Sequence, residues 1–230
     1  MALVFALLKI KDSGAPDRME KFVDGARALS KDYPNQVNGY QCIMSAMEDY
    51  EFLGKPDKAR ALAQEMIDSS APDNFKKWAR GFLYRLDSMG KPVAMQFTAV
   101  DGRDVDLAKM KGKVVLVGFW ITGFKAEMLK VKAVFEKYQS QGFEVIGISC
   151  DTDNGELGKF VKGNGITWPQ YFDGKQQGEN KFAVEFGIDG VPHMFLVDKN
   201  GCLRFDDVRA STKENQVDLE KKIEELLAEQ

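Results

Sequence analysis

Cysteine and histidine are the residue types best suited to nucleophilic or metal chemistry, and this chain has few of either. The three cysteines, Cys42, Cys150 and Cys202, are far apart in the 230-residue sequence. They form neither a CxxC pair nor a metal-spaced set, so we expect no disulfide framework. Cys42 belongs to a predicted helix face and Cys202 to a turn exit. The chain has a single histidine, His193, so a Cys/His zinc site would be hard to assemble. We expect no metal and no other cofactor.

Cys150 is the cysteine with the strongest case for chemistry, because it follows a predicted buried strand over residues 142–149. If that strand is parallel to its neighbour, Cys150 lies at the edge of the sheet where both strands end. A reactive thiol must be stabilised as the thiolate. Asp151 and Asp153 disfavour an anion beside them. We therefore favour a buried, weakly polar role for Cys150 over redox chemistry.

His193 begins a predicted strand over residues 193–197. Imidazole titrates near neutral pH, so His193 could be a base or a ligand. The sequence shows no partner for this side chain, and we expect a structural role.

The element that must position these residues is a continuous apolar run over residues 113–120, rich in β-branched side chains. Such a run predicts a strand buried on both faces. After a short turn, apolar residues recur at helical spacing from Met128 to Tyr138. A buried strand that leads into a helix places the intervening turn at the carboxyl end of a sheet, where α/β proteins carry their chemistry.

Residues 112–128 resemble the signature of the thioredoxin-like thiol-disulfide oxidoreductases of the TlpA and AhpC/TSA group. That signature is G-K-x-V-x-V-x-F-W-A-T-W-C-x-x-C-R-x-E-M. The chain fits it at Gly112, Lys113, Phe119, Trp120, Thr122, Lys125 (for the basic residue), Glu127 and Met128.

The chain departs from this signature at the redox motif. Between Thr122 and Lys125 the family has Trp-Cys-x-x-Cys, and this chain has only Gly123-Phe124, so both redox cysteines are missing. Gly118 stands where many relatives have an acidic residue. The resemblance therefore implies the family's fold without its dithiol.

The implied fold is α/β, a thioredoxin fold with a central mixed sheet flanked by helices, from about residue 94 to the C-terminus. Residues 166–172 resemble the family's I-x-W-P segment. The patterns along the chain agree with this fold; they predict a hairpin over 95–100 and 103–107, helices over 154–163, 180–186 and 215–229, and strands over 142–149, 193–197 and 202–206.

Residues 17–86 have a helical pattern interrupted by short Pro- and Gly-containing links, which predicts four helices in antiparallel hairpins. The third helix resembles a tetratricopeptide-type hairpin. A small helical bundle and a peptide-binding repeat array are both open. The helical periodicity ends at residues 89–92, Met-Gly-Lys-Pro, and an alternating strand pattern follows. We therefore predict a helical N-terminal domain, 1–88, and a thioredoxin-like domain, 89–230.

Bulk composition gives few hints about partners. A net charge of -3 gives no reason to expect nucleic acid or an anionic membrane as a partner. We expect no membrane span. Residues 1–8 are apolar but lack a basic region and a cleavage site, so we expect no signal peptide. The resembling proteins are usually exported, and the compartment of this chain stays open.

The resemblance also implies a binding groove. Val191-Pro192 matches the family's cis-proline site, which faces the redox turn and presents its backbone to an extended chain. The alternatives are that this proline serves only the fold and that the aromatic residues of the turn fill the core or its rim. The groove that we predict for an extended peptide or protein partner comprises Trp120, Gly123, Phe124, Val191, Pro192 and His193.

Three functional interpretations remain. Disulfide exchange through CxxC needs an attacking and a resolving thiol, so the sequence favours a redox-inactive binding or scaffold protein that uses the cis-proline groove or the helical domain. The alternative is a thiol-dependent oxidoreductase or antioxidant protein that acts through Cys150, alone or with a partner's thiol. The third is an ordinary reductase whose turn has been cut. Whether the chain is an enzyme stays open.

Overall fold

The computed structural model describes residues 2–210 and 217–229. The chain divides into two compact units, Met1–Leu86 and Asp87–Gln230. None of the helices in the described part of the chain has the length and hydropathy that crossing a bilayer requires.

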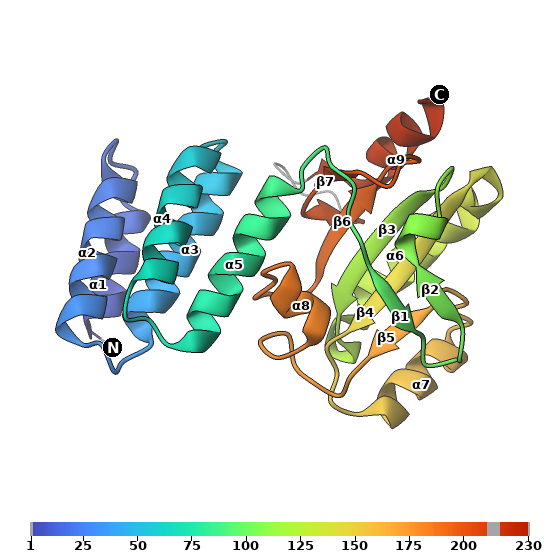
Figure 1. Cartoon of the computed structure of the whole chain (residues 1–230), viewed down its shortest axis with the longest axis horizontal. Helices are drawn as coiled ribbons and strands as arrows, with labels where there is room; N and C mark the ends of the chain where they lie inside the picture. The colour runs from blue at the N-terminus through green and yellow to red at the C-terminus, as the bar shows by residue number, and fades with distance from the viewer. Residues whose placement is uncertain (1, 211–216, 230) are drawn as a thin grey trace. The chain divides into compact units, whose positions relative to one another are not determined.

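The first unit is a row of helices in which chain neighbours lie side by side (Figure 1). Small residues let these helices approach closely: a Cβ on Gly39 would lie 2.5 Å from the backbone nitrogen of Ser30. Ala26, Ala46, Ala59 and Ala63 are fully buried between the helices. The helices are α1 (Ala2–Lys11), α2 (Arg18–Asp32), α3 (Asn38–Phe52), α4 (Pro56–Asp68) and α5 (Asp73–Asp87).

Helix α1 is an addition to the helices predicted from the sequence. Its apolar residues surround the helix instead of forming one stripe, so periodicity did not reveal it. Leu7 is buried in the helical core, and Val4 and Ile10 pack against that core. Residues 2–11 therefore belong to the first unit.

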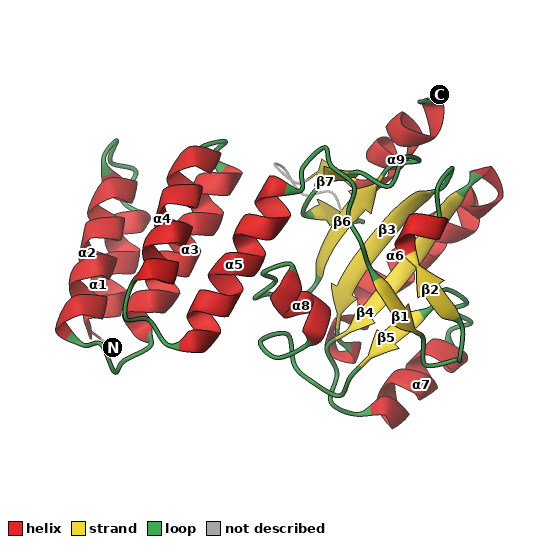
Figure 2. Ribbon diagram, viewed as in Figure 1, coloured by secondary structure: helices red, strands yellow, loops and turns green. Residues whose placement is uncertain are grey.

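The second unit is built on a five-stranded mixed sheet in the order β5-β4-β3-β6-β7 (Figure 2). β3 pairs with β4 in parallel and β6 in antiparallel orientation. Two shorter pairs accompany the sheet, β1 with β2 and β8 with β9. The strands are β1 (Gln96–Thr98), β2 (Asp104–Asp106), β3 (Val114–Trp120), β4 (Phe143–Ser149), β5 (Gln170–Phe172), β6 (His193–Val197), β7 (Leu203–Phe205), β8 (Val208–Arg209) and β9 (Val217–Asp218).

Helices cover both faces of the sheet. Alternate residues of β3 point to opposite faces. Leu116 and Trp120 pack with side chains of α6 (Lys125–Tyr138), α7 (Asn154–Gly163) and α9 (Leu219–Ala228). Val117 and Phe119 pack with the β1–β2 hairpin and α8 (Lys181–Glu185). Short 3-10 turns complete the unit: η1 (Leu107–Lys109), η2 (Thr122–Phe124) and η3 (Gln139–Gln141). The predicted α/β thioredoxin fold is confirmed.

The start of the predicted C-terminal helix needs correction. Residues 215 and 216 lie outside the described residues, and the next two residues form β9 instead of helix. Helix α9 begins at Leu219 because Asp218 caps it, with a side-chain oxygen that accepts a hydrogen bond from the Lys221 backbone at 3.3 Å.

The segment predicted as a boundary is paired within the second unit. Gly90 N–H donates to the Leu203 carbonyl at 2.7 Å, and Leu203 N–H donates to the Lys91 carbonyl at 3.0 Å. Val93 N–H bonds to the Gly201 carbonyl at 3.0 Å. Residues 90–93 therefore extend the sheet edge beside β7 and are not a free linker. The domain limits 1–88 and 89–230 stay a prediction.

Candidate functional site

The turn between β3 and α6 occupies the position of the redox motif, and it is anchored to the end of β4. Thr122 donates to the Asp151 carboxylate through its backbone N–H at 2.9 Å and its hydroxyl at 2.8 Å. The Ser149 hydroxyl donates to the other Asp151 oxygen at 2.9 Å. The Asp151 carboxylate therefore fixes the start of η2 to the end of β4.

Cys150 lies beside this turn, since its backbone N–H donates to the Trp120 carbonyl at 2.8 Å. Its side chain is buried. Burial raises the pKa of the Cys150 thiol to about 12, and the nearby carboxylates of Asp173 and Asp151 add to the effect. The thiol is therefore neutral at physiological pH, which is the opposite of what a nucleophilic cysteine needs.

One detail of the sequence interpretation is wrong: Asp153 is not among the carboxylates that act on the thiol. It caps α7, accepting from the Gly155 backbone N–H at 2.7 Å. Asp173, distant in sequence, acts on Cys150 instead because β5 ends beside β4.

Asp173 is held by a dense set of donors. Asn180 Nδ2 lies 3.0 Å from Asp173 Oδ1 and also donates to the Ser149 carbonyl at 3.2 Å. The Tyr171 hydroxyl donates to Asp173 at 3.2 Å. Burial raises the pKa of the Tyr171 phenol to about 12, and Asp173 contributes. These neutral donors satisfy the carboxylate and keep the surroundings of Cys150 rigid.

The second half of the candidate groove lies at the start of β6. The Val191–Pro192 bond is cis. Phe119 pairs with His193 as the last pair of the two antiparallel strands, so Ile121, two residues after Phe119, and Val191, two residues before His193, lie at the same end of the sheet. Both of these side chains pack against one core cluster. The Pro192 carbonyl accepts a hydrogen bond from Arg209. The cis-proline segment and the shortened turn therefore share one end of the sheet.

His193 has a partner that sequence reasoning missed. Its Nε2 lies 2.7 Å from Asp206 Oδ1, and both side chains are largely buried. Asp206 directly follows β7, and the β6–β7 pairing brings it back beside the start of β6. The two strands predicted at 193–197 and 202–206 are joined by a short turn, and their antiparallel pairing could have indicated that Asp206 returns to His193. The contact is with a carboxylate at the sheet edge, and it ties His193 to the end of β7.

Trp120 must be removed from the predicted groove. Its side chain is fully buried, its Nε1 donates to Gln170 Oε1 at 3.1 Å, and its ring lies 5.4 Å from that of Phe160. Trp120 is a core residue because its position alternates onto the helix-covered face of β3. Phe124 is the exposed aromatic residue of the turn, with 47% of its surface accessible. The predicted groove is then reduced to Gly123, Phe124, Val191, Pro192 and His193, and it stays a prediction.

Within the described residues, no group of three or more His, Cys, Asp and Glu side chains is arranged to hold a metal ion. The site therefore offers backbone groups, one exposed aromatic ring and a His–Asp pair.

The mixed sheet, the helices on both faces and the proline opposite the β3–α6 turn define a thioredoxin fold. The chain belongs to the AhpC/TSA family, whose model matches residues 90–206. It is 30% identical over 129 residues to the thiol-disulfide oxidoreductase ResA of Bacillus thuringiensis (strain Al Hakam), covering 55% of this chain and 72% of that protein. It is also 30% identical over 119 residues to ResA of Geobacillus thermodenitrificans, covering 50% of this chain and 66% of the relative.

Solved structures share the fold of the second unit. A candidate thiol:disulfide interchange protein DsbE from Chlorobium tepidum matches with a TM-score of 0.52 at 23% identity, covering 61% of this chain and 97% of that one. A thiol-disulfide oxidoreductase from Bacteroides fragilis matches with a TM-score of 0.50 at 19% identity, covering 58% of this chain and 97% of that one. The chain thus belongs to a thiol-disulfide oxidoreductase family. Its own sequence contains no CxxC motif.

Proposed function

We propose that this chain is a redox-inactive member of the family that binds an extended peptide or protein segment in the groove between Phe124 and Val191. Binding by main-chain pairing needs no particular side chain, so it can persist where the dithiol has been lost.

The observation that carries the proposal is the state of the Val191 backbone. Within the described residues, neither its N–H nor its C=O has a hydrogen-bond partner, and the residue is only partly buried. An extended chain alongside Val191 could satisfy both groups. Phe124 supplies exposed apolar area at the rim for one side chain of that chain.

The chemistry of the cysteines supports the redox-inactive part of the proposal. Exchange needs a thiolate and a resolving thiol. The pKa of Cys150 is raised to about 12, and Cys42 and Cys202 also have raised pKa values, chiefly through burial. Each effect lowers the thiolate fraction near neutral pH. An oxidoreductase acting through Cys150 is therefore the weaker candidate.

Binding of a permanently unfolded protein tests the proposal. Fluorescein-labelled, S-carboxymethylated α-lactalbumin is titrated with the full chain, and fluorescence anisotropy is read. Carboxymethylation blocks the probe's thiols, so a signal reports binding and not disulfide exchange. The informative variant is Phe124→Asp, which places a charge in the groove rim. The matched control is Val100→Asp, because Val100 is similarly exposed, at 45% against 47%, and belongs to the β1–β2 turn.

We expect saturable binding by the wild-type chain and by Val100→Asp, and about tenfold weaker binding by Phe124→Asp, the equivalent of ~1.4 kcal/mol. Equal binding by all three proteins would exclude this groove and direct attention to the helical unit. Absence of saturable binding by the wild-type chain would reject the proposal.

A further inference from the structure

We propose that a second site exists on the β1–β2 hairpin: the outer edge of β2 and the groove beside it bind an extended peptide that carries a lysine or arginine side chain. This site is distinct from the groove at Val191 and does not depend on it.

The register of the hairpin leaves the outer edge of β2 open. Ala99 N–H donates to the Arg103 carbonyl at 2.8 Å, and Leu107 N–H donates to the Met95 carbonyl at 2.9 Å. Hydrogen-bonded pairs alternate along an antiparallel ladder, so every second residue of β2 turns its backbone toward β1. Asp104 and Asp106 fall between those pairs, and their N–H and C=O groups point away from β1.

These outward backbone groups are available for pairing. Outside the β1–β2 ladder, whose register turns these groups away from β1, the backbone N–H and C=O groups of Asp104 and Asp106 have no hydrogen-bond partner in the described part of the chain. Asp104 is exposed and Asp106 is partly exposed. Alternate residues of one strand present donors and acceptors at the spacing of an extended chain, which is the requirement for strand addition.

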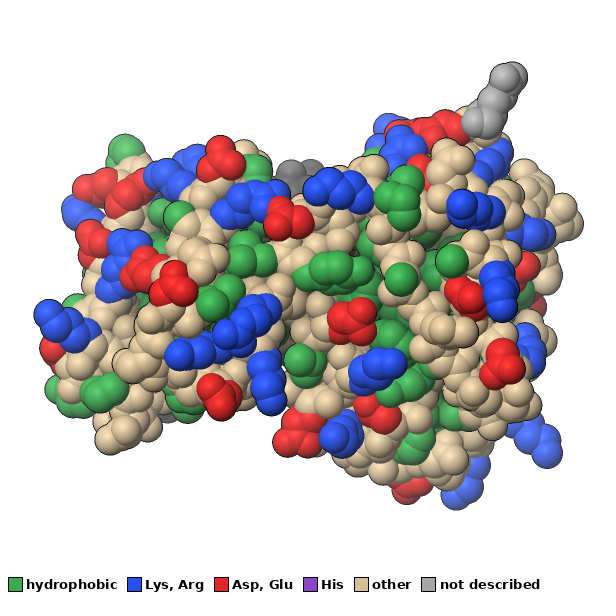
Figure 3. Space-filling view, viewed as in Figure 1, with side chains coloured by type: hydrophobic (Ala, Val, Ile, Leu, Met, Phe, Trp, Pro, Cys, Tyr) green, Lys and Arg blue, Asp and Glu red, His purple; other side chains and the backbone are tan. Residues whose placement is uncertain are grey.

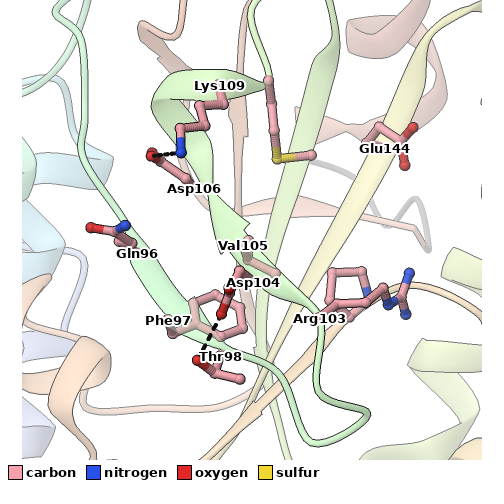
Figure 4. Close-up of a pocket in the computed structure, with 11 residues that line it drawn as sticks. Gln96, Phe97, Thr98, Arg103, Asp104, Val105, Asp106, Lys109 and Glu144 are labelled. Atoms are coloured by element: carbon pink, nitrogen blue, oxygen red, sulfur yellow. Dashed lines mark hydrogen bonds and ion pairs between the residues drawn. The ribbon is translucent and has the colours of Figure 1, made fainter.

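A groove of about 670 Å³ runs along this edge (Figure 4). Its volume falls in the range of small-ligand sites, ~300–1,000 Å³, and suits a few residues of a peptide. In Figure 3, hydrophobic atoms lie among acidic and basic side chains on the face that carries β1 and β2. The groove is lined by both strands of the hairpin, by Lys109 and Met110, and across from them by Glu144 and Pro169.

Pro169, on the side of the groove opposite β2, cannot fill the groove by adding further strand pairing to the sheet. Gly147 N–H donates to the Pro169 carbonyl at 2.9 Å, and β5 begins at the next residue, Gln170. Proline has no N–H, so the β4–β5 ladder ends there. The Thr167 carbonyl is turned to the Arg103 guanidinium at 2.7 Å. The groove thus stays open beside β2.

The charges around the groove select a cation. Arg103 is already paired with Asp101 at 2.5 Å. The other charged groups that line the groove are one cation, Lys109, and three carboxylates, those of Asp104, Asp106 and Glu144. The contact of Lys109 with Asp106 is long, 3.6 Å, and the Lys109 side chain is 81% exposed. Within the described residues, the Asp104 carboxylate accepts a hydrogen bond only from the Thr98 hydroxyl, at 2.9 Å.

Glu144 is the carboxylate that most needs a partner. It is partly buried, and within the described residues its side-chain carboxylate makes neither a hydrogen bond nor an ion pair. A basic side chain of a peptide paired with β2 would meet Glu144 across the groove and Asp104 beside it. The competing explanation is that charged residues guard this edge against all strands, as edge strands often do. That explanation predicts no binding.

The test is a titration of the full chain into a fluorescein-labelled peptide, Gly-Thr-Val-Lys-Val-Lys-Thr-Gly, read by fluorescence anisotropy. A second peptide has glutamate in place of both lysines. Two further peptides carry N-methyl groups on alternate amides. In one peptide the methylated amides all lie on one edge of the extended chain, and in the other they all lie on the opposite edge. The protein variants are D104N/E144Q and, as matched control, Glu156→Gln on the exposed side of α7.

We expect saturable binding of the lysine peptide that weakens as ionic strength rises and is not shared by the glutamate peptide. Each lost carboxylate should weaken binding by up to about fivefold. Glu156→Gln should leave binding unchanged, as should Phe124→Asp, which separates this site from the groove at Val191. One of the two N-methylated peptides should lose binding and the other should keep it, because strand addition uses one edge.

Absence of binding would favour the guarding explanation and overturn the proposal. Equal binding of the glutamate peptide, full binding by the double variant, or indifference to both methylation patterns would overturn it as well. Loss of binding in Phe124→Asp alone would assign the peptide to the Val191 groove.

Discussion

The Thr122 hydroxyl donates to Asp151 Oδ1 at 2.8 Å, and this contact joins the shortened turn after β3 to the residue after Cys150 at the end of β4. The same carboxylate receives the Thr122 backbone N–H and the Ser149 hydroxyl. One side chain therefore organises the place where relatives of this chain carry their redox motif.

Asp151→Ala should destabilise the second unit by about 1–3 kcal/mol, because three donors lose a charged acceptor in a partly buried place. Asp151→Asn keeps one acceptor oxygen and should cost less. Urea unfolding followed by circular dichroism measures both. A loss no larger than that of the exposed control Asp189→Ala would show that the contact does not support the turn.

Cys150 should resist alkylation. With a pKa of about 12, its thiolate fraction at pH 8 is on the order of 10⁻⁴, and its side chain is buried. Iodoacetamide at pH 8, followed by peptide mass spectrometry, should modify Cys202 before Cys150, since Cys202 is only partly buried. Both should react fully in urea. Rapid modification of Cys150 in the folded protein would contradict its assignment as a buried neutral thiol.

Stability should fall at alkaline pH through the same thiol. The folded-state pKa of Cys150 is raised from 9.0 to about 12, so between these values the folded state holds a proton that the unfolded state has released. The stabilisation is present below pH 9 and is lost as the pH rises through about 12. Cys150→Ala should show a shallower decline between pH 9 and 11, measured by urea unfolding. An unchanged slope would refute this origin.

Insulin reduction with dithiothreitol should not be accelerated by this chain, since it lacks paired thiols in one turn. The turbidity of precipitating insulin B chain measures the rate. Turnover above dithiothreitol alone that disappears in Cys150→Ser would establish the single-cysteine oxidoreductase instead.

Gly147 should tolerate no side chain. A Cβ there would lie 2.0 Å from Gln170 Oε1, and that amide is buried and accepts the Trp120 indole N–H. Gly147→Ala should destabilise the chain by about 2–4 kcal/mol by overpacking and loss of this hydrogen bond. Gly158→Ala, on α7 with open space around the added Cβ, should stabilise by about 0.5–1 kcal/mol. Thermal unfolding compares the two, and equal effects would contradict the packing argument.

The fold was predictable because its strongest signal is local. The buried run that became β3 is apolar on both faces, and its neighbours β4 and β6 have patterns of the same kind. Strand β6 begins and ends where the sequence predicts, at His193 and Val197. By contrast, α1 was missed because its apolar residues form no single stripe, and β9 was missed because two residues carry no period.

The site was less predictable because its contacts join residues far apart in the chain. Asp206 meets His193 only through the β6–β7 pairing, and Asp173 acts on Cys150 only because β5 lies beside β4. Trp120 was placed in the groove by its relation to the family motif. Its burial follows from which face of β3 it occupies, and the alternation along the strand carried that information.

The last ladder pair between β3 and β4 is Trp120 with Ser149, and the turn that follows lies wholly outside the sheet. A change in the length of this turn therefore requires no shift in strand register while Thr122 keeps its anchor on Asp151, although an insertion between Gly123 and Phe124 would replace the Phe124 N–H bond to the Ile121 carbonyl. We therefore expect the second unit to accept a grafted loop at this turn. A randomised loop library grafted at that point would present its sequences from a rigid base, and its chemistry would be set by the graft alone.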